Sequence, residues 1–376
     1  MIATRTGLAK ATVGTIVGHL LATGAVGDHA PGPGGSVPSR GRPGRPVELT
    51  GAGTVGLGLE VNVDYLAAVA LDLSGRTRLF EVHPFRPGHG SQVLDALSDL
   101  AVRCHAGLVD EGHVVLGVTV AVPGLVDRGL GRVTSAPNLG WSDVDLADHV
   151  SAGLGVGVAV SIDNDANCAA LAEVERGAAV GLRDVLYLTG TVGVGGGLVV
   201  DGAVARGGRG YAGEVGHMAV GGSQAACACG RRGCWEAQIG LRATLAAVGM
   251  QHPDGHRGAD PVTVATRIAA RAPHDVAVRA GLARVGESLA AGVSVLANTL
   301  NPAMIVLGGY FVPLGPWLLP AVEASLSADV FAPDGGGCTV ALSPLGLRAA
   351  AIGAAAEVVA EVFAGRRELP PGSLAP

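Results

Sequence analysis

The sequence predicts an α/β fold made of layered sheets and helices. From Thr54 onward, short runs rich in valine alternate with longer stretches of helical periodicity, and such alternation is typical of α/β layers. The chain has 376 residues, of which 48% are hydrophobic, so it is long enough for two or three domains. The residues before Thr54 differ in composition, which indicates a separate N-terminal piece.

Composition excludes several classes of protein. No uninterrupted run of ~18 apolar residues occurs, so we expect no transmembrane helix and no membrane partner. The first residues, MIATRTGLAK, lack the apolar stretch of a signal peptide. The chain has six cysteines, three of them scattered and three clustered. This usage fits a reducing compartment with one metal site and predicts a cytoplasmic protein.

Residues 1–30 predict a partial helix-turn-helix. A Gly-containing turn at Thr6–Leu8 precedes an apolar helix face formed by Val13, Ile16, Val17, Leu20 and Leu21. In such a motif the second helix enters the major groove of DNA with its N-terminal residues against the bases. Lys10, Thr12 and Thr15 are therefore candidate DNA contacts. An ordinary amphipathic helix pair is the alternative.

Residues 31–53 predict a wing or linker, because Gly, Pro and Ser dominate them. Arg42 and Arg45 lie among these residues, and an extended segment of this kind fits a narrow minor groove. Residues 1–50 carry five basic side chains against two acidic ones, whereas the whole chain has a net charge of −6. The charge is consistent with a nucleic-acid contact at this end, and a plain interdomain hinge is the alternative interpretation.

The body, residues 54–366, predicts elements in a regular order. Strands interrupted at Asn62–Asp64 and Leu73–Gly75 open it. The remaining elements are a helix over Ser91–Val109, strands over Val114–Val122 and Val156–Ile162, a helix ending at Arg176, and strands over Val185–Leu188, Leu198–Val200, Ala303–Leu307 and Thr339–Leu342. A short tail, residues 367–376, ends the chain.

Two predicted loops carry possible chemistry. Thr189–Gly197 is glycine-rich, and glycines let backbone N–H groups approach phosphates or hydroxyls. The loop lacks the Gly-Lys-Ser/Thr ending of a Walker motif, and a tight hairpin explains it equally well. Asp163–Asp165 lies where a strand meets a helix. Helix capping is the simpler interpretation there, since Asp and Asn are preferred capping residues.

The segment 217–234 predicts a metal site. His217 precedes Cys227, Cys229 and Cys234, and Gly230 and Gly233 let the short loop fold back on itself. One imidazole and three thiolates suit a closed tetrahedral zinc site, which would be structural because no coordination position is left open. Buried free thiols are the alternative, but three cysteines in eight residues favour zinc.

Several segments together resemble the ROK family of repressors and sugar kinases. Glu214–His217 with the cysteine cluster matches the most specific signature of that family, and Ser161–Cys168 resembles its catalytic loop. Pro123–Asp127, Ala136–Trp141, Gly193–Gly197 and Asn301–Gly309 are similar to its sugar-side and phosphate-side motifs. The resemblance implies an actin-like, ribonuclease-H-like body of two lobes with the pocket between them, following a partly truncated winged helix-turn-helix.

The resemblance also implies site residues. The sugar contacts would be Asn138, Asn164, Asp165, Glu214, His217 and Glu236, whose side chains suit hydroxyl groups. His217 would bind zinc through one ring nitrogen and offer the other to a sugar. The residues matching the phosphate motif are Thr191, Gly193, Gly195 and Gly196. In kinase members the residue matching Asp165 acts as the general base.

Two departures bear on function. The Asp-x-Gly-Gly-Thr phosphate loop of the kinases is replaced by Glu60-Val61-Asn62-Val63-Asp64, where valine side chains would stand in place of phosphate-binding amides. The helix-turn-helix also looks short, and we expect a start upstream of Met1. The sequence therefore predicts a sugar-responsive regulator, acting on a DNA operator as a homodimer or homotetramer. A sugar kinase using Mg-ATP and Asp165, or a non-catalytic sugar-binding relic, are the alternatives.

Overall fold

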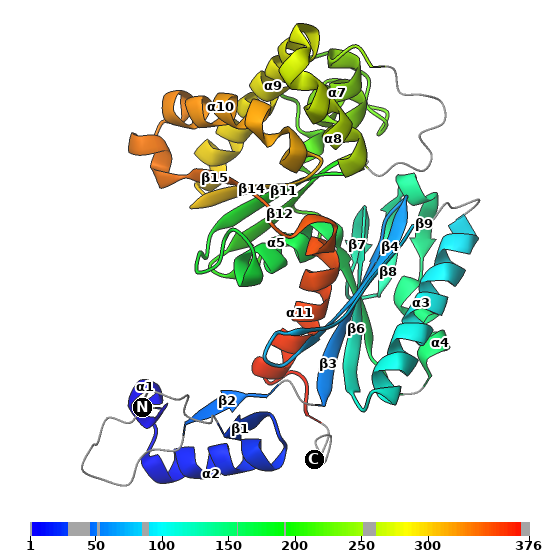
Figure 1. The fold of residues 1–376 in the computed structure, drawn as a ribbon, viewed down its shortest axis with the longest axis vertical. Helices are drawn as coiled ribbons and strands as arrows, with labels where there is room; N and C mark the ends of the chain where they lie inside the picture. The colour runs from blue at the N-terminus through cyan, green and yellow to red at the C-terminus, as the bar shows by residue number, and fades with distance from the viewer. Residues whose placement is uncertain are drawn as a thin grey trace.

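The computed structural model describes residues 2–28, 46–50, 53–84, 90–155, 157–191, 193–250 and 261–369. Figure 1 shows two α/β lobes stacked along the long axis, with a small N-terminal module at the far end of the first lobe. Each lobe has a five-stranded sheet in which three consecutive antiparallel strands are followed by two parallel ones. The lobes therefore repeat one topology.

The first lobe is built on the strand order β10-β6-β3-β4-β5. These strands are β3 (Thr54–Val61), β4 (Tyr65–Asp72), β5 (Thr77–Pro84), β6 (Val114–Val122) and β10 (Val160–Asn164). Helices α3 (Gly90–Asp110) and α4 (Leu146–Leu154) cover one face, and α11 (Ala349–Phe363) covers the other. Strand β3 is buried on both faces, and α11 approaches it closely because Gly58 has no side chain. A Cβ on Gly58 would lie 2.1 Å from the Ala351 carbonyl oxygen.

A three-stranded sheet extends the first lobe beside its parallel strands. It consists of β7 (Leu125–Asp127), β8 (Arg132–Ala136) and β9 (Trp141–Val144), with the 3-10 helix η1 (Pro137–Leu139) between the last two. Trp141 and Leu139 are buried in the core of the lobe, so the small sheet is firmly attached to it.

The second lobe is built on the strand order β13-β12-β11-β14-β15. Its strands are β11 (Val185–Gly190), β12 (Val194–Val200), β13 (Ala203–Val204), β14 (Met304–Gly309) and β15 (Thr339–Leu342). Its helices are η2 (Val215–His217), α6 (Glu236–Ile239), α7 (Leu241–Ala247), α8 (Pro261–Arg271), η3 (Ala272–His274), α9 (Val276–Leu300), α10 (Phe311–Asp329), η4 (Pro333–Gly337) and η5 (Gly346–Arg348).

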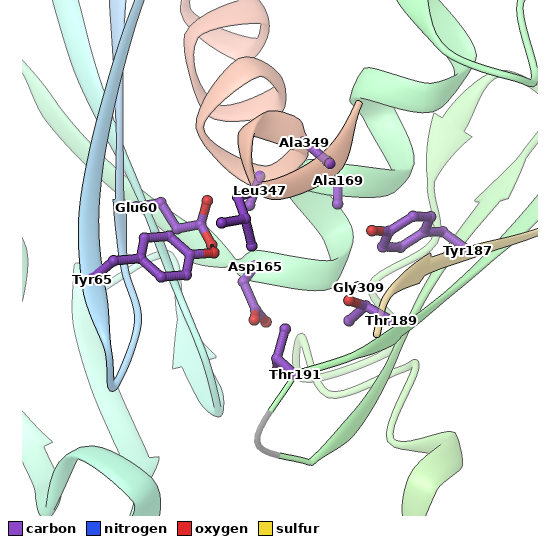
Figure 2. A pocket seen from close by; sticks show the side chains of 12 residues that line it. Glu60, Tyr65, Asp165, Ala169, Tyr187, Thr189, Thr191, Gly309, Leu347 and Ala349 are labelled. Atoms are coloured by element: carbon purple, nitrogen blue, oxygen red, sulfur yellow. Dashed lines mark hydrogen bonds between the residues drawn. The ribbon is translucent and has the colours of Figure 1, made fainter. Parts of the chain in front are cut away.

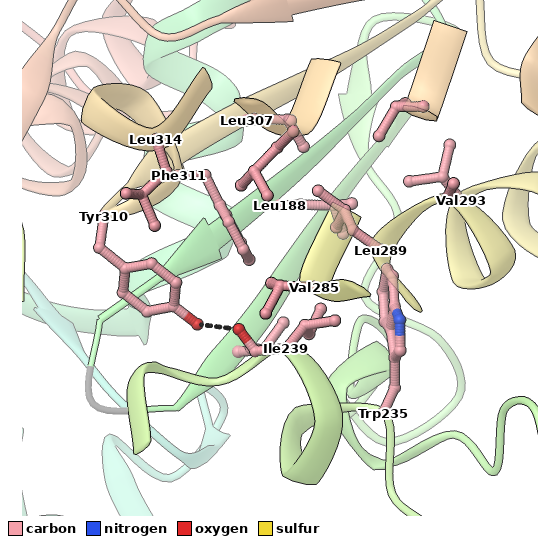
Figure 3. Close-up of a cluster of buried hydrophobic side chains, with 14 of the residues drawn as sticks. Leu188, Trp235, Ile239, Val285, Leu289, Val293, Leu307, Tyr310, Phe311 and Leu314 are labelled. Atoms are coloured by element: carbon pink, nitrogen blue, oxygen red, sulfur yellow. Dashed lines mark hydrogen bonds between the residues drawn. The ribbon is translucent and has the colours of Figure 1, made fainter. Parts of the chain in front are cut away.

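Two aromatic side chains, Tyr310 and Trp235, are buried in the core of the second lobe (Figure 3). The Tyr310 hydroxyl donates to the Ile239 carbonyl at 3.0 Å, and the Trp235 ring nitrogen donates to the Ser288 carbonyl at 2.7 Å. Among the described helices, α9 alone is long and apolar enough to cross a membrane. It is mostly buried and packs on α10, as a core helix does.

Helix α5 (Asp165–Arg176) joins the lobes. It packs against α11 of the first lobe and against β11 and β12 of the second. Small residues form this contact, including Ala166, Cys168 and Ala170 on α5 and Ala350 and Ala354 on α11. The backbones therefore lie close together: a Cβ on Gly353 would be 1.7 Å from the Cys168 carbonyl oxygen.

The N-terminal module contains α1 (Ile2–Thr6), α2 (Lys10–Ala22) and a two-stranded antiparallel sheet of β1 (Val26–Asp28) and β2 (Val47–Leu49). The predicted turn before α2 is present, with Gly7 at φ +69°. The predicted apolar face is half-buried except for Ile16, which is 45% exposed. Arg42 and Arg45 lie outside the described residues.

Some predicted boundaries were wrong. The strand expected at Val156 begins at Val160 and continues to Asn164, because its pairing with β6 runs from Val160 to Asn164. Most of the predicted loop Thr189–Gly197 lies inside β11 and β12, so the tight hairpin is the better description. Arg367, expected in the tail, donates to the Leu116 carbonyl and pairs with Glu361 at 2.6 Å.

Candidate functional site

The junction between β10 and α5 carries three consecutive polar residues, Asp163, Asn164 and Asp165, of which Asp165 lines the cleft. Asn164 caps the helix: its side-chain oxygen accepts from the backbone N–H groups of Ala166 and Asn167 at 2.9 and 3.2 Å. Its amide nitrogen donates to the Gly124 carbonyl at 3.0 Å. The capping interpretation is confirmed. Asn164 has one N–H left for a ligand and mainly fixes its neighbours in place.

Asp165, the first residue of α5, lies against the cleft (Figure 2). Burial raises the pKa of its carboxyl to about 6, the Ala166 backbone N–H opposes this, and the Glu214 carboxylate raises it further. A carboxyl in this range is half ionised slightly below neutral pH, which suits either acceptance of a sugar hydroxyl or general base catalysis.

Glu60 faces Asp165 from the end of β3, and the sequence did not identify it as a functional residue. Both carboxyls line one pocket, which encloses about 330 Å³ of unfilled space, part of it open to solvent. Figure 2 shows Glu60 and Tyr65 on one side of Asp165 and Tyr187 and Thr189 on the other. Among the described residues that line this pocket, none is lysine or arginine.

The Glu60 carboxyl is only partly satisfied. Tyr65 donates to its Oε1 at 2.5 Å, whereas its Oε2 has no hydrogen-bond partner among the described residues. Burial raises the pKa of Glu60 to about 8; the Tyr65 hydroxyl opposes the shift and the Asp165 carboxylate adds to it. An anionic phosphate chain entering this pocket would meet two carboxyls and no compensating side-chain cation.

The turn after β3 also offers no phosphate cradle. The Asn62 N–H donates to the Tyr65 carbonyl at 2.9 Å, and the Val63 N–H donates to the Asn62 side-chain oxygen at 2.8 Å. Both amides are therefore occupied. The expectation that Val61 and Val63 project toward a phosphate was wrong. Val61 lies in the core of the first lobe, because alternation along β3 turns Glu60 toward the cleft and Val61 away from it. Val63, in the turn after β3, packs against the same core.

The glycines of the β11–β12 hairpin have packing roles. A Cβ on Gly193 would lie 2.3 Å from Glu236 Oε2, so the missing side chain makes room for that carboxylate. Gly196 packs against Val215 and the Gly213 carbonyl, and Gly195 against Ala166. Thr191, in the turn between the strands, lines the pocket with Asp165. Phosphate binding by these residues stays a prediction.

Three of the predicted sugar residues, Glu214, His217 and Glu236, lie together on the second lobe. Glu236 accepts from the Val194 N–H through Oε2 at 2.9 Å, and its Oε1 lies 3.4 Å from Cys227 Sγ. Burial and Glu236 raise the pKa of Glu214, and His217 opposes the shift. Through Glu214 this group connects with Asp165. Asn138, in η1, is exposed, and no contact places it with them.

His217, Cys227, Cys229 and Cys234 form a candidate metal site, since their ligand atoms all lie within 4.8 Å of one another. Cys229 Sγ and Cys234 Sγ are 3.6 Å apart, and Cys227 Sγ is 3.8 Å from His217 Nδ1. Two sulfurs bound tetrahedrally at ~2.3 Å from zinc would be about 3.8 Å apart, so the donor set fits that ion. Gly233 has φ +80° at the fold of the loop, and its Cβ would clash with the Ser223 carbonyl at 2.6 Å.

Comparison with known proteins decides the family. The sequence model of the ROK family matches residues 57–361. The chain belongs to the ROK family. The match covers both lobes, the cleft and the cysteine cluster, and it begins after the N-terminal module.

Relatives fall into two groups. The xylose repressor of Bacillus spizizenii is 28% identical over 356 residues, which cover 94% of this chain and 88% of the repressor. The xylose repressor of Caldicellulosiruptor bescii is 29% identical over 366 residues, covering 95% and 90%. The glucokinase of Halalkalibacterium halodurans is 32% identical over 274 residues, covering 70% of this chain and 81% of the kinase.

The similar solved structures also include a regulator and a kinase. A ROK family transcriptional regulator, described as a homologue of the E. coli MLC protein, superposes with a TM-score of 0.78 at 22% identity, covering 97% of this chain and 91% of the regulator. A ROK family glucokinase from Streptomyces griseus, in complex with glucose and AMPPNP, gives 0.66 at 27% identity, covering 81% and 98%. Both establish the two-lobed ROK fold for this chain.

Proposed function

We propose that this chain is a sugar-responsive transcriptional regulator. The N-terminal module would bind a DNA operator as a winged helix-turn-helix, and the interlobe cleft would bind a hexose, pentose or related sugar. The observation that carries the proposal is the module itself: a turn, a helix with exposed Lys10, Thr12 and Thr15, and a two-stranded wing precede the ROK body. Alignments with repressors over 94–95% of the chain must include part of this module.

The cleft supports the sensing role over catalysis. The turn amides that would hold a phosphate are occupied, and Glu60 adds a second carboxyl beside Asp165. Phosphoryl transfer relies on positive groups placed around the phosphates. The sugar side keeps its acceptors, Asp165, Glu214 and Glu236, next to the candidate zinc loop. Zinc would hold this loop, so that His217 and Glu236 stay in place for the sugar.

The regulator would act in the cytoplasm as a homodimer or homotetramer, because recognition helices usually work in symmetric pairs. The relatives' names suggest D-xylose and D-glucose as first probes. A thermal-shift screen with and without Mg-ATP tests the sugar site, since a ligand that binds the folded state raises its melting temperature. Selection from a random DNA library, followed by titration at several salt concentrations, tests the module. Absence of both responses in the zinc-loaded protein would refute the proposal.

A sugar kinase is the second candidate, and Asp165 is the observation that favours it. Its carboxyl lies at the cleft with a pKa of about 6, as a general base requires. A coupled assay of ADP release with glucose and xylose separates the two functions. Turnover that disappears in Asp165→Asn would favour the kinase.

A further inference from the structure

Four charged side chains form a compact group between the cleft and α11. Arg128, from the turn between β7 and β8, donates to Asp163 and pairs with Glu357 at 2.7 Å. Arg206, which follows β13, pairs with the same two carboxylates at 2.5 and 3.1 Å. Both arginines therefore bridge one residue of β10 and one residue of α11. We call Arg128, Asp163, Arg206 and Glu357 the charge quartet.

The charge quartet is largely removed from water. The Asp163 side chain is 3% exposed and that of Glu357 13%, while the arginines are less than a third exposed. Asp163 is further held by the Asn164 N–H and by Asn167, at 2.8 and 3.3 Å. Two positive and two negative charges balance. Separating such buried partners leaves charges uncompensated, so the four segments resist sliding past one another.

Two segments of the quartet carry residues of the candidate sugar site, and a third leads toward Asn138. Asp163 directly precedes Asn164 and Asp165. Arg206 lies at the start of the loop that leads to Glu214 and His217. This loop is closed by a hydrogen bond from the Ala212 N–H to the Arg206 carbonyl at 3.0 Å. Arg128 lies in the turn before β8, and η1, which carries Asn138, follows β8. A sugar that shifts any of these segments would therefore act on the quartet.

The fourth segment leads to the N-terminal module. Glu357 lies within α11, whose next residues, Val358 and Val359, belong to one apolar cluster with Ala25 of the module. Leu20 of α2 packs against this cluster. Figure 1 shows α11 running from between the lobes toward β1 and β2. One helix thus carries a member of the quartet, Glu357, and two members of the apolar cluster that includes Ala25 of the N-terminal module.

We propose that the charge quartet, through Glu357, transmits the sugar-bound state of the cleft along α11 to the N-terminal module. Glu357 is a positioning residue, because it is not among the residues that line the pocket and it lies outside the N-terminal module. This inference rests on the proposed function and adds its route of regulation. An effector can change DNA affinity only if it favours one of two arrangements, and the quartet makes the cleft segments and α11 change arrangement together.

The test compares sugar-dependent DNA binding in wild type and Glu357→Gln. The probes are D-xylose, D-glucose and a DNA duplex selected by the wild-type protein from a random library. Regulatory coupling is typically about 5–150-fold in affinity, and the same factor applies to sugar affinity in the presence of DNA. We expect Glu357→Gln to bind sugar and DNA separately, with the coupling reduced to about twofold or less.

Two further variants separate coupling from folding. Arg206→Lys keeps the charge but loses the fork that reaches both carboxylates, and we expect intermediate coupling. Asp201→Asn breaks the exposed pair between Arg183 and Asp201 on the second lobe and should leave coupling unchanged. If Glu357→Gln is too unstable to purify, Arg206→Lys alone decides the outcome.

The outcomes distinguish the two proposals. Wild-type protein whose DNA affinity does not respond to either sugar, although both DNA and sugar bind, overturns the regulatory function and this inference with it. Wild-type coupling that persists unchanged in Glu357→Gln and Arg206→Lys overturns the inference alone. Coupling lost in Glu357→Gln and reduced in Arg206→Lys, with the separate affinities and Asp201→Asn unchanged, supports it.

Discussion

Replacement of Glu60 by glutamine should make the protein more stable at alkaline pH. The pKa of Glu60 rises from 4.5 to about 8 in the folded protein. Since the folded state favours the protonated carboxyl, this residue costs no stability below pH 4.5, and the cost grows as pH rises to 8. A shift of about 3.5 units corresponds to about 5 kcal/mol at most, of which about 3.5 kcal/mol develops between pH 5 and 8.

Thermal melting of wild type and Glu60→Gln from pH 5 to 9 measures this effect. The variant keeps the shape and the contact with Tyr65, so the melting temperatures should lie close together at pH 5. The variant should melt several degrees higher at pH 8, at roughly 2 °C per kcal/mol or less for a chain of this size. Glu287→Gln, at an exposed position on α9, is the control. A constant difference between wild type and Glu60→Gln across this range would show that Glu60 is ionised in the fold and would contradict the argument.

Four further results are expected. Gly58→Ala should destabilise the protein by several kcal/mol, because its Cβ meets the backbone of α11 at 2.1 Å, whereas Gly107→Ala, in open space on α3, should be neutral or stabilising by about 0.5–1 kcal/mol in chemical unfolding. Chelation of the metal, or Cys234→Ser, should abolish the sugar-induced melting shift while α5 and the first lobe stay folded, as circular dichroism would show. Sugar affinity measured by calorimetry should increase as pH rises through about 6, when Asp165 becomes a full acceptor, and this pH dependence should vanish in Asp165→Asn. Lys10→Ala should weaken binding to the selected duplex by about 1–3 kcal/mol and relax its sequence preference, and an unchanged preference would exclude a base contact.

The fold was predictable where the pattern of the sequence is local. Val114–Val122 has the bounds that its nearly continuous apolar run predicts, because a central strand buried on both faces carries few polar residues. The strand before Asp163 was placed too early, since Val156 and Val158 are as apolar as a strand requires. Pairing with β6, a contact between distant segments, decides where that strand begins.

The candidate site was also predictable where its residues are close in sequence, and not where they are brought together by distant contacts. The cysteine cluster was visible because its four ligands lie within 18 residues, and the structure brings them to within 4.8 Å. Glu60 was missed as a functional residue because its role depends on burial by Tyr65 and α11, which no local pattern shows. The interpretation of Val61 and Val63 failed for a related reason. The departure from the phosphate loop was interpreted from sequence position alone, whereas strand alternation turns Glu60, and not Val61, toward the cleft.

The same dependence on distant contacts explains how one cleft can serve two functions in a family. The proposed sugar acceptors of this chain, Asp165, Glu214 and Glu236, lie at the start of α5 and on the second lobe, and Glu236 is held by the β11–β12 hairpin beside the candidate metal loop. The phosphate side depends on the turn after β3, where Asn62 occupies the Val63 amide and Glu60 brings a carboxyl into the pocket. Under the proposed function, changes confined to this turn would remove the anion site and leave the proposed sugar site intact. Helix α11 lines the cleft through Ala349 and Ala350 and shares an apolar cluster with Ala25 through Val358, so in a regulator of this kind it would carry the output.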